Sequence, residues 1–329
     1  MPYSAAVVGL GNIGFGYDSH DQDNLRIRTH VHAFVSHPDY QLVGAVDTDP
    51  LRRALFEEKY HCRADADLAG LYSHSNPEIV AIAVPTTVHA EVFGEIVARK
   101  PRAVICEKPL AATVSEAENM LAEARKQGCS VAVNYMRRAE PGTIAIKKMI
   151  SEGGLGELRK ATAWYSKGIA NNGSHMIDLF RFLLGDVSDV SVLREGRLWQ
   201  NSDPEPDLCI LFGNTPVYLL AAAEEDYSLN EFELIGSKAM LWYGDGGNHI
   251  ELREAKIKVG ASGIGILEPA GRRLASDMQR YQWHMVEALS KHLSNGLSLP
   301  SDGVSALETL RVVERIVRNI SLTEKFCVE

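Results

Sequence analysis

The sequence predicts an α/β protein of two domains: an N-terminal doubly wound parallel sheet, followed by an α+β domain with a large, mostly antiparallel open sheet. Three observations predict this fold class. Short apolar runs alternate with helical patterns in the first third, a glycine-rich turn follows the first run, and long β-type runs separated by glycine turns fill the second half. Because 329 residues exceed one ordinary core, we expect two domains, at residues 1–134 and 135–329.

The first domain is predicted to consist of β–α units. Its strands are continuous apolar runs, which is the pattern of parallel strands covered by helices on both faces. In chain order, we expect a strand at 5–9, a helix at 31–36, a strand at 41–47, a helix at 50–60, a strand at 79–84, a helix at 90–98, a strand at 103–106, a helix at 115–127 and a strand at 130–133.

The second domain is predicted to mix helices with an antiparallel sheet, because Gly-Asn, Gly-Ser and Gly-Asp-Gly-Gly turns separate its β-type runs. Ser301 or Asp302 is the expected cap of the last helix. We expect helices at 144–151, 176–184, 273–293 and 301–320, and strands at 158–166, 187–199, 207–212, 217–224, 232–235 and 239–243.

Composition restricts the partners. A formal net charge of −9 opposes any broad attraction to nucleic acid or to anionic lipid, so a small molecule is the expected partner. The five cysteines are scattered without a C-x-x-C pair or a metal-ligand spacing, which predicts reduced thiols in a cytoplasmic protein. The N-terminus shows no signal-peptide pattern, and the longest apolar runs fall short of the roughly 18 residues of a membrane helix.

Residues 9–14 read Gly-Leu-Gly-Asn-Ile-Gly and fit the pattern G-x-G-x-x-G directly after a strand. Glycine permits a tight turn and a close approach of the backbone to a pyrophosphate. We therefore expect a Rossmann dinucleotide-binding domain with cofactor contacts from Gly9, Gly11, Asn12, Ile13 and Gly14. The alternative is that these glycines serve only a strand-to-helix turn.

Asp47 ends the second predicted strand. A carboxylate at this position accepts hydrogen bonds from the adenosine ribose hydroxyls and repels the additional phosphate of NADP, which favours NAD. Arg52 and Arg53 lie close enough in sequence to keep NADP as an alternative. The other interpretation of Asp47 is a solvent-facing turn residue.

A polar insertion at 15–28 separates the glycine turn from the first predicted helix. Its segment 18–23 contains potential metal ligands. However, it lacks the glycine and closing glutamate of a calcium loop, and a single histidine makes a poor zinc site. We expect a solvated acidic loop near the cofactor and no metal.

Further motifs make the chain resemble the Gfo/Idh/MocA oxidoreductase family over nearly its whole length. The resemblance implies a Rossmann domain joined to an α/β domain with a large open sheet, and it places Pro85, Thr86, His89, Glu107 and Lys108 at the cofactor. The motifs are Gly9 to Gly14, Pro85-Thr86 followed by His89 and Glu91, Glu107-Lys108-Pro109, Gly154-Leu155-Gly156-Glu157, Gly173-Ser174-His175 with Asp178, and Ile235-Gly236-Ser237-Lys238-Ala239.

The family's lysine corresponds to Lys108, and the resemblance implies that it lies beside the nicotinamide and contacts the substrate hydroxyl that loses its hydride. An ammonium there stabilises developing charge on that oxygen. The resemblance also implies a cis peptide bond at Pro109. The alternative is that Glu107 and Lys108 form an ordinary exposed strand end.

The family's acid/base histidine corresponds to His175, since an imidazole exchanges protons near neutral pH. Asp178 lies one helical turn onward on the same face, where it can orient the ring. In the alternative, this segment is only a helix start, in which Asn171, Asn172 or Ser174 caps the helix and Asp178 complements its dipole.

Asn171 stands where many relatives carry an aspartate, and an amide can orient a substrate hydroxyl but cannot ionise. In this respect the chain resembles nucleotide-sugar 3-dehydrogenases more than inositol dehydrogenases. Tyr165 and Lys167 are further candidates to face the substrate, as are Arg137 and Arg138, because arginine suits a carboxylate or diphosphate. Surface or interdomain ion pairs are the alternative role of these charged residues.

The leading functional hypothesis is hydride transfer between NAD and a secondary hydroxyl or carbonyl of a sugar, cyclitol or nucleotide sugar, with Lys108, His175 and Asn171 as catalytic residues. The alternative is a non-catalytic regulator that senses NAD or NADP. The resemblance also implies a homodimer or homotetramer that covers the open face of the second sheet, on which we expect Trp199, Leu211, Tyr218, Leu220 and Trp242.

Overall fold

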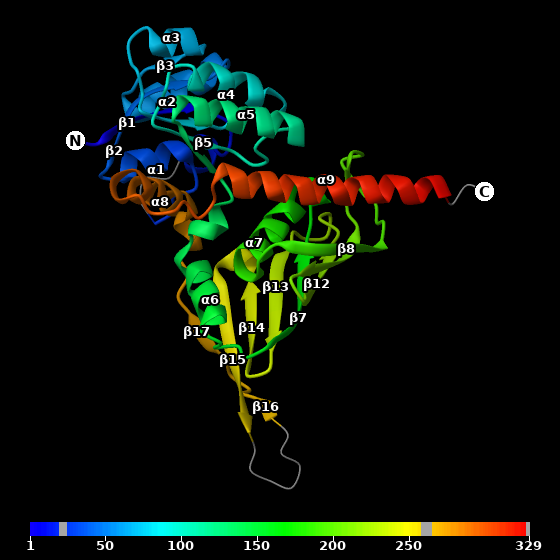
Figure 1. The fold of residues 1–329 in the computed structure, drawn as a ribbon. Helices are drawn as coiled ribbons and strands as arrows, with labels where there is room; N and C mark the ends of the chain where they lie inside the picture. Colours follow the sequence, from blue (N-terminus) through cyan, green and yellow to red (C-terminus); the bar gives the residue numbers. More distant parts are fainter. Residues whose placement is uncertain (20–24, 258–264, 327–329) are drawn as a thin grey trace. The chain divides into compact units, whose positions relative to one another are not determined.

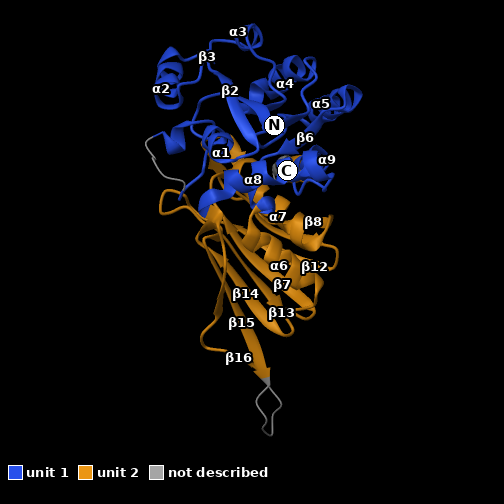
Figure 2. Cartoon of the chain, turned by 90° about the vertical axis from the view of Figure 1, so that its left-hand side faces the viewer, with its two compact units in different colours: residues 1–139, 279–310 blue, residues 140–278, 311–329 orange. Residues whose placement is uncertain are grey.

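The computed structural model describes residues 1–19, 25–257 and 265–326. The chain divides into two compact units, with residues 1–139 and 279–310 in unit 1 and residues 140–278 and 311–329 in unit 2 (Figure 2). The predicted boundary after residue 134 lies close to the first crossing. The segment 279–310 was predicted in the second domain, but the structure places it in unit 1.

Unit 1 is built on a six-stranded sheet in which every neighbouring pair is parallel, as predicted. The strands lie in the order β3-β2-β1-β4-β5-β6. β3 is only two residues long, and it was not predicted because a two-residue strand carries no periodic signal. The strands are β1 Tyr3–Val8, β2 Tyr40–Val46, β3 Ala64–Asp65, β4 Ile79–Ile82, β5 Ala103–Cys106 and β6 Ser130–Val133.

Helices cover both faces of this sheet (Figure 1). Successive residues of a strand point to opposite faces, so Ala5 and Val7 pack in one core while Ala6 and Val8 pack in the other. This confirms the doubly wound arrangement. The helical segments are η1 Gly16–Asp18, α1 His30–Ser36, α2 Pro50–Tyr60, α3 Leu68–Tyr72, η2 Thr86–Val88, α4 His89–Val97, α5 Val114–Gln127, η3 Met136–Ala139 and α8 Tyr281–Asn295.

The chain returns to unit 1 because apolar side chains of α8 and of the start of α9 pack in the two cores of that unit. α8 buries Val286 and Leu289 in the core that contains Ala5. The first turns of α9 (Gly303–Phe326) bury Ala306 and Leu307 in the core that contains Ala6. Asp302 begins α9 by accepting a hydrogen bond from the amide of Ser305 at 2.7 Å, as expected for a helix cap.

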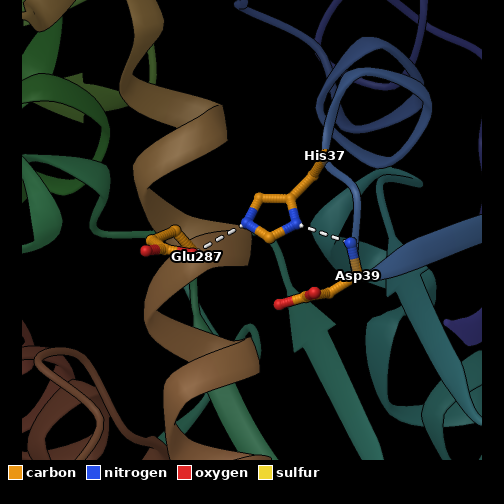
Figure 3. A group of neighbouring side chains, drawn as sticks. All are labelled: His37, Asp39 and Glu287. Carbon is orange, nitrogen blue, oxygen red and sulfur yellow. Dashed lines mark hydrogen bonds and ion pairs between the residues drawn. The ribbon is translucent and has the colours of Figure 1, made fainter. Parts of the chain in front are cut away.

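A polar cluster holds α8 against the turn between α1 and β2 (Figure 3). The amide of Asp39 donates to Nδ1 of His37 at 3.2 Å, so the ring hydrogen lies on Nε2, which donates to Glu287 at 2.8 Å. Glu287 also pairs with Lys291, and Asp39 accepts from Ser290. Because these partners occupy the side chains that could ligate an ion, we interpret the cluster as a helix attachment.

Unit 2 contains a nine-stranded sheet whose neighbouring strands are antiparallel except for the pair β7 and β12. A parallel pair needs a long crossover connection, and here the chain from α7 to β11 lies between the two strands. The strands are β7 Leu158–Tyr165, β8 Val187–Arg194, β11 Asp207–Phe212, β12 Thr215–Ala221, β13 Asn230–Gly236, β14 Ala239–Gly244, β15 His249–Ile257, β16 Gly265–Leu267 and β17 Arg272–Leu274.

Three helical elements bury their apolar side chains in the core on one face of this sheet (Figure 1). They are α6 (Pro141–Ser151), α7 (Ser174–Leu184) and the second part of α9. The other short elements of unit 2 are the π-helical turn η4 (Gly168–Gly173), η5 (Asp245–Gly247) and the separate two-stranded sheet of β9 (Leu198–Trp199) and β10 (Asp203–Pro204). Among the described residues, no helix is long and apolar enough to cross a bilayer.

Two expectations for the second domain were wrong in detail, and one long strand was not predicted. The predicted strand at 187–199 is split into β8 and β9, so Trp199 lies in the two-stranded sheet and not on the open face of the large one. The predicted helix at 273–293 begins only at Tyr281, because β17 and the short turn η6 (Met278–Arg280) precede it. β15 was missed because the alternation that begins with its buried Ile250 and Leu252 is interrupted by Glu254.

The base of the insertion at 15–28 is closed by the buried carboxylate of Asp18. Its Oδ2 accepts hydrogen bonds from the amides of Arg28 at 2.7 Å and Thr29 at 2.8 Å, and Nδ1 of His32 lies 3.4 Å away. Burial raises the pKa of Asp18, but these hydrogen bonds outweigh burial and lower the pKa to about 2. The remainder of the predicted acidic loop, residues 20–23, lies outside the described residues.

We expect Asp18→Asn to reduce the free energy of unfolding by about 2 kcal/mol near pH 7, because each unit of pKa shift corresponds to about 1.4 kcal/mol. The pKa of Asp18 is lowered on folding. The stabilisation is therefore present above the ordinary pKa of 3.8 and is lost as the pH falls toward 2. Urea unfolding near pH 7 and near pH 3 measures this difference, with the exposed Asp226→Asn as control. An equal cost at both pH values would contradict the assignment.

Candidate functional site

The glycine-rich turn is held by close backbone packing. Gly9 has φ +99°, and a Cβ at this residue would lie 2.5 Å from the carbonyl oxygen of Ala83. A Cβ at Gly14 would lie 1.9 Å from the carbonyl oxygen of Gly9. Only glycine fits at these two positions, and the turn they form can approach a pyrophosphate closely.

The insertion does not break the connection between this turn and α1. The amides of His30 and Val31, at the start of α1, donate to the carbonyl oxygens of Ile13 and Gly14, both at 3.1 Å. The helix therefore begins on the glycine turn as if residues 15–28 were absent. This explains why the spacing between Gly14 and the end of β2 is longer than usual for the fingerprint.

A pocket of about 800 Å³ lies beside the turn, at the carboxyl ends of β1, β2 and β4. Gly9, Gly11, Asp47 and Pro85 line it, so the structure brings together four of the predicted cofactor residues. The glycine cradle and the position of the pocket at the strand ends fit a dinucleotide. The other predicted cofactor residues, including Asn12, Ile13, Gly14, Thr86, Glu107 and Lys108, do not line this pocket.

Asp47 is buried at the rim of this pocket. One carboxylate oxygen accepts from the amide of Leu10 in the glycine turn at 2.6 Å, and the other accepts from the amide of Asp49 at 2.8 Å. The guanidinium of Arg52 lies 3.7 Å from the carboxylate. Arg53 instead donates to the backbone carbonyl of Asp47, at 2.7 Å. Asp47 is therefore fixed in place rather than a free turn residue.

The charged side chains around the pocket are mostly acidic. Asp47, Asp67, Glu91 and Glu95 line it together with a single basic residue, Arg52. This composition disfavours an additional phosphate on the ribose. Asp47 was predicted at the cofactor, and Glu91 was noted only as part of a family motif. Asp67 and Glu95 were not predicted, because they come from elements that meet only in the folded sheet.

His89 connects two loops near the strand ends instead of reaching the pocket. Its Nε2 lies 2.9 Å from the carbonyl oxygen of Val84, and its Nδ1 lies 3.1 Å from that of Pro109. The residue is fully buried. The expectation that His89 contacts the cofactor directly is therefore corrected: it positions the loops after β4 and β5.

The Glu107-Lys108-Pro109 segment follows β5, and its Lys108–Pro109 peptide bond is cis, as expected. Oε1 of Glu107 accepts from Nδ2 of Asn134 at 2.6 Å and from Nε2 of His30 at 2.8 Å. Burial opposes ionisation of Glu107. The hydrogen bonds and the charge of Lys108 outweigh burial and lower the pKa of Glu107.

Gln282 of α8 extends this network. Its Nε2 lies 2.9 Å from Nδ1 of His30, whose side chain is wholly buried. Because an amide NH₂ only donates, Nδ1 accepts and Nε2 carries the hydrogen given to Glu107. Sequence analysis missed His30, Asn134 and Gln282. Their roles depend on elements that are distant in the chain, and no spacing signal marks them.

In unit 2, the turn η4 leads directly into α7 and carries Asn171. The amides of Ala170 and Asn171 donate to the carboxylate of Asp203 at 3.0 and 2.9 Å. Burial raises the pKa of Asp203, while these amides oppose the rise. Gly168 is required here, because its φ is +78° and a Cβ would meet the Asp203 carboxylate at 2.1 Å. Asp203, on β10, was not predicted.

His175 and Asp178 lie in the first turns of α7, and both are buried. Three residues apart on one helix, they share a face, as predicted. The helix has no side-chain cap: its N-cap is Gly173, and the hydroxyl of Ser174 donates to the carbonyl oxygen of Asn171 at 2.8 Å. The capping alternative considered for this segment is therefore not what the structure contains.

Two predicted substrate residues have other partners. Tyr165 is fully buried on the inner face of the sheet, and its hydroxyl donates to the carbonyl oxygen of Pro206 at 2.8 Å. Strand alternation places Tyr165 in the core with Ala163, which corrects the expectation that it faces the substrate. Lys167 forms an ion pair with Glu224 at 2.8 Å.

Comparison with known proteins shows what the chain resembles in sequence and in fold. Residues 3–135 match the model of the Gfo/Idh/MocA family, described as an oxidoreductase family with an NAD-binding Rossmann fold. Over 145 residues, the chain is 30% identical to dTDP-3,4-didehydro-2,6-dideoxy-alpha-D-glucose 3-reductase from Streptomyces antibioticus, covering 44% of this chain and 43% of the relative. Over 200 residues, it is 26% identical to inositol 2-dehydrogenase from Rhizobium meliloti, covering 56% of each.

The chain thus spans about half the length of the curated relatives it matches. Solved structures extend the similarity of fold to the whole chain. An NAD binding oxidoreductase from Klebsiella pneumoniae superposes with a TM-score of 0.78 at 15% identity, covering 98% of each chain. At this identity the match establishes the fold of both units and nothing about substrate.

Proposed function

Because residues 3–135 match the model of the Gfo/Idh/MocA oxidoreductase family, with its NAD-binding Rossmann fold, we propose that the chain is an NAD-dependent oxidoreductase of this family. Its substrate class is a sugar, cyclitol or nucleotide sugar, and the reaction interconverts a secondary hydroxyl and a carbonyl. The observation that carries the proposal is Lys108 at the end of β5, next to Glu107, whose carboxylate is 12% exposed and accepts two hydrogen bonds. An ordinary exposed strand end does not need such a network.

The dinucleotide is held by residues of unit 1. Gly9 and Gly11 give the pyrophosphate access to the backbone, and Asp47 accepts hydrogen bonds from the ribose hydroxyls. The acidic lining of the pocket supports NAD over NADP. When bound, the nicotinamide supplies the hydride acceptor for oxidation and the hydride donor for reduction.

The residues around the substrate have separate tasks in this proposal. In oxidation, the C–H bond of the carbinol carbon breaks as the C=O bond forms, and the hydroxyl proton leaves to His175. The ammonium of Lys108 stabilises the negative charge that develops on the oxygen. Asn171 holds a second hydroxyl of the ring, since its amide both donates and accepts but does not ionise. These roles follow the family motifs that the three residues match.

The test is a rise or fall in absorbance at 340 nm, the band of the reduced nicotinamide, with sugars, cyclitols and nucleotide sugars as substrates and with NAD and NADP compared. We expect turnover with at least one substrate class and a higher kcat/KM with NAD than with NADP. A chain that binds NAD but turns over none of these classes would contradict the proposal.

We further propose that a second copy of the chain covers the outer face of the large sheet and that the protein is a cytoplasmic homodimer or homotetramer. Trp164, Leu211, Tyr218, Leu220 and Trp242 all leave apolar surface accessible there, and Trp164 is 42% exposed. Trp164 and Leu220 are direct cross-strand neighbours. An aromatic and aliphatic face of this kind is typical of protein interfaces.

We expect light scattering to give the mass of two or four chains at micromolar concentration. We expect Trp164→Glu to shift the mass toward one chain, because it places a charge in the apolar interface. Arg159→Glu, an exposed substitution at the start of the same strand, serves as a check on general effects of charge. A wild-type mass of one chain that does not depend on concentration would remove the proposal.

A further inference from the structure

Arg137 is a buried cation with two donor atoms that have no acceptor among the described residues. It lies in η3, directly after β6, and its side chain is among the buried polar groups of unit 1, with 7% of the residue exposed. Its Nε and Nη1 are buried and have no hydrogen-bond partner among the residues that the structure describes. A guanidinium is always charged, and burying one without an anion is strongly unfavourable. The structure therefore calls for an anionic group at this position.

The neighbouring arginine does not share this feature. Nη1 of Arg138 donates to the backbone carbonyl oxygen of Pro300 at 3.3 Å. Two consecutive arginines of the same turn thus differ: one is bonded within unit 1, and the other keeps two buried donors open. The difference makes Arg138 a matched control for Arg137.

An unused acceptor lies in the same turn. Asn134 donates its Nδ2 to Glu107, and its buried Oδ1 has no partner among the described residues. The amide cannot be reversed without placing its oxygen against the Glu107 carboxylate. The segment after β6 therefore carries open donors on Arg137 and an open acceptor on Asn134, and the chemistry of these groups suits a ligand with both an anionic group and a hydroxyl.

The topology separates this anion from the pyrophosphate. The pyrophosphate binds at the end of β1, and the sheet order β1-β4-β5-β6 places β6 three strands away. With strands about 4.8 Å apart, this separation is about 14 Å. Lys108, in contrast, follows β5, the direct neighbour of β6. Arg137 therefore lies on the side of the reacting hydroxyl rather than on that of the cofactor phosphates.

We propose that the substrate is an anionic sugar derivative, a polyhydroxy acid whose carboxylate or phosphate binds Arg137 while a hydroxyl donates to Asn134. This inference rests on the proposed function and narrows it to acidic substrates. The planar guanidinium binds both anions by charge-assisted hydrogen bonds, so the chemistry they share is a compact group of acceptor oxygens. The alternative is that buried water molecules accept hydrogen bonds from Arg137 and donate one to Asn134.

The experiment compares acids with their neutral counterparts at 340 nm. The pairs are D-glucuronate with D-glucose and D-galacturonate with D-galactose, and D-glucose 6-phosphate and UDP-glucose test phosphate as the source of the anion. We expect kcat/KM for an acid to exceed that of its neutral counterpart. In Arg137→Met, we expect the value for the acid to fall by about 10- to 100-fold, the effect of removing a hydrogen bond to a charged group.

In the same variant, kcat/KM for the neutral substrate and the dissociation constant of NAD should each change by less than about threefold. A change of this size is smaller than the loss of one hydrogen bond to a charged group. Arg138→Met should leave the ratio of acid to neutral substrate unchanged. Equal losses on acid and neutral substrates, or a wild-type preference for the neutral sugar, would overturn the inference. Turnover of neutral sugars but not of acids would support the proposed function and contradict only the inference that the substrate is anionic.

A binding measurement covers the case in which no substrate of the panel is turned over or the variant is unstable. With NAD present, we expect the acids to raise the melting temperature of the wild-type protein, and neutral sugars to raise it less. Arg137→Lys keeps the positive charge but loses the planar set of N–H donors of the guanidinium, so the acids should raise its melting temperature less. If no acid raises the melting temperature of the wild type, water and not an anion occupies the site.

Discussion

Lys108→Met is expected to lower kcat by about 100- to 1,000-fold, the cost of removing one preorganised group that stabilises charge on a reacting oxygen. Methionine keeps the length and the apolar stem of the side chain but not the ammonium. Because Lys108 does not line the pocket beside the glycine turn, we expect the dissociation constant of NAD to change little. Steady-state rates at 340 nm and titration of NAD by protein fluorescence measure the two quantities separately.

Glu107→Gln separates charge from packing at the same site. The amide has the shape of the carboxylate, but it removes the negative charge beside Lys108 and weakens the hydrogen bond from His30. We expect an intermediate loss of kcat. Lys126→Met, an exposed substitution on α5, is the control for the loss of a lysine. A Lys108→Met enzyme with the wild-type kcat would show that the ammonium does not act on the reacting oxygen.

His175→Gln is expected to lower kcat by about 100-fold or more, the range for removing a general acid or base. The expected signature is in the pH profile. If His175 moves the proton, the wild-type rate of oxidation falls as the pH drops through the region in which an imidazole is protonated. This limb should be absent from the variant, because an amide does not titrate.

The size of the loss alone does not identify the role of His175, since the residue is buried in α7 and its replacement can disturb the helix. Loss of the pH-dependent limb is the readout that a purely structural role would not give. His61→Asn is a suitable control: His61 is exposed in the left-handed region at φ 50°, which asparagine tolerates. A His175→Gln profile with the same limb as the wild type would assign the proton transfer to another group.

Much of the Rossmann fold could be predicted because its strands are buried on both faces. β5, β6 and helix α2 of this unit begin and end at the predicted residues. Periodicity did not identify the elements whose partners lie far away. Glu254 interrupts the short alternating pattern of β15. The segment 279–310 was assigned to the second domain because nothing local shows that its apolar side chains pack in the cores of unit 1.

The site was predictable to the extent that its residues lie in local motifs. The glycine turn, Asp47 and the cis bond at Pro109 follow from short stretches of sequence or from the family resemblance that those stretches carry. The network of His30 and Gln282 around Glu107 joins α1, α8 and β5, and no short stretch contains it. Open hydrogen-bonding atoms such as those of Arg137 are visible only when burial and partners are known for each atom.

We expect this chain to turn over a sugar-type substrate with NAD and not only to sense the dinucleotide. The most direct measurement uses one preparation each of wild type and Lys108→Met, and records NAD binding and the change in absorbance at 340 nm with the same substrate. We expect equal binding of NAD in both proteins and loss of turnover in the variant. NAD binding without turnover in either protein, across sugars, cyclitols and nucleotide sugars of both charge types, would contradict it and favour a regulatory protein on the same fold.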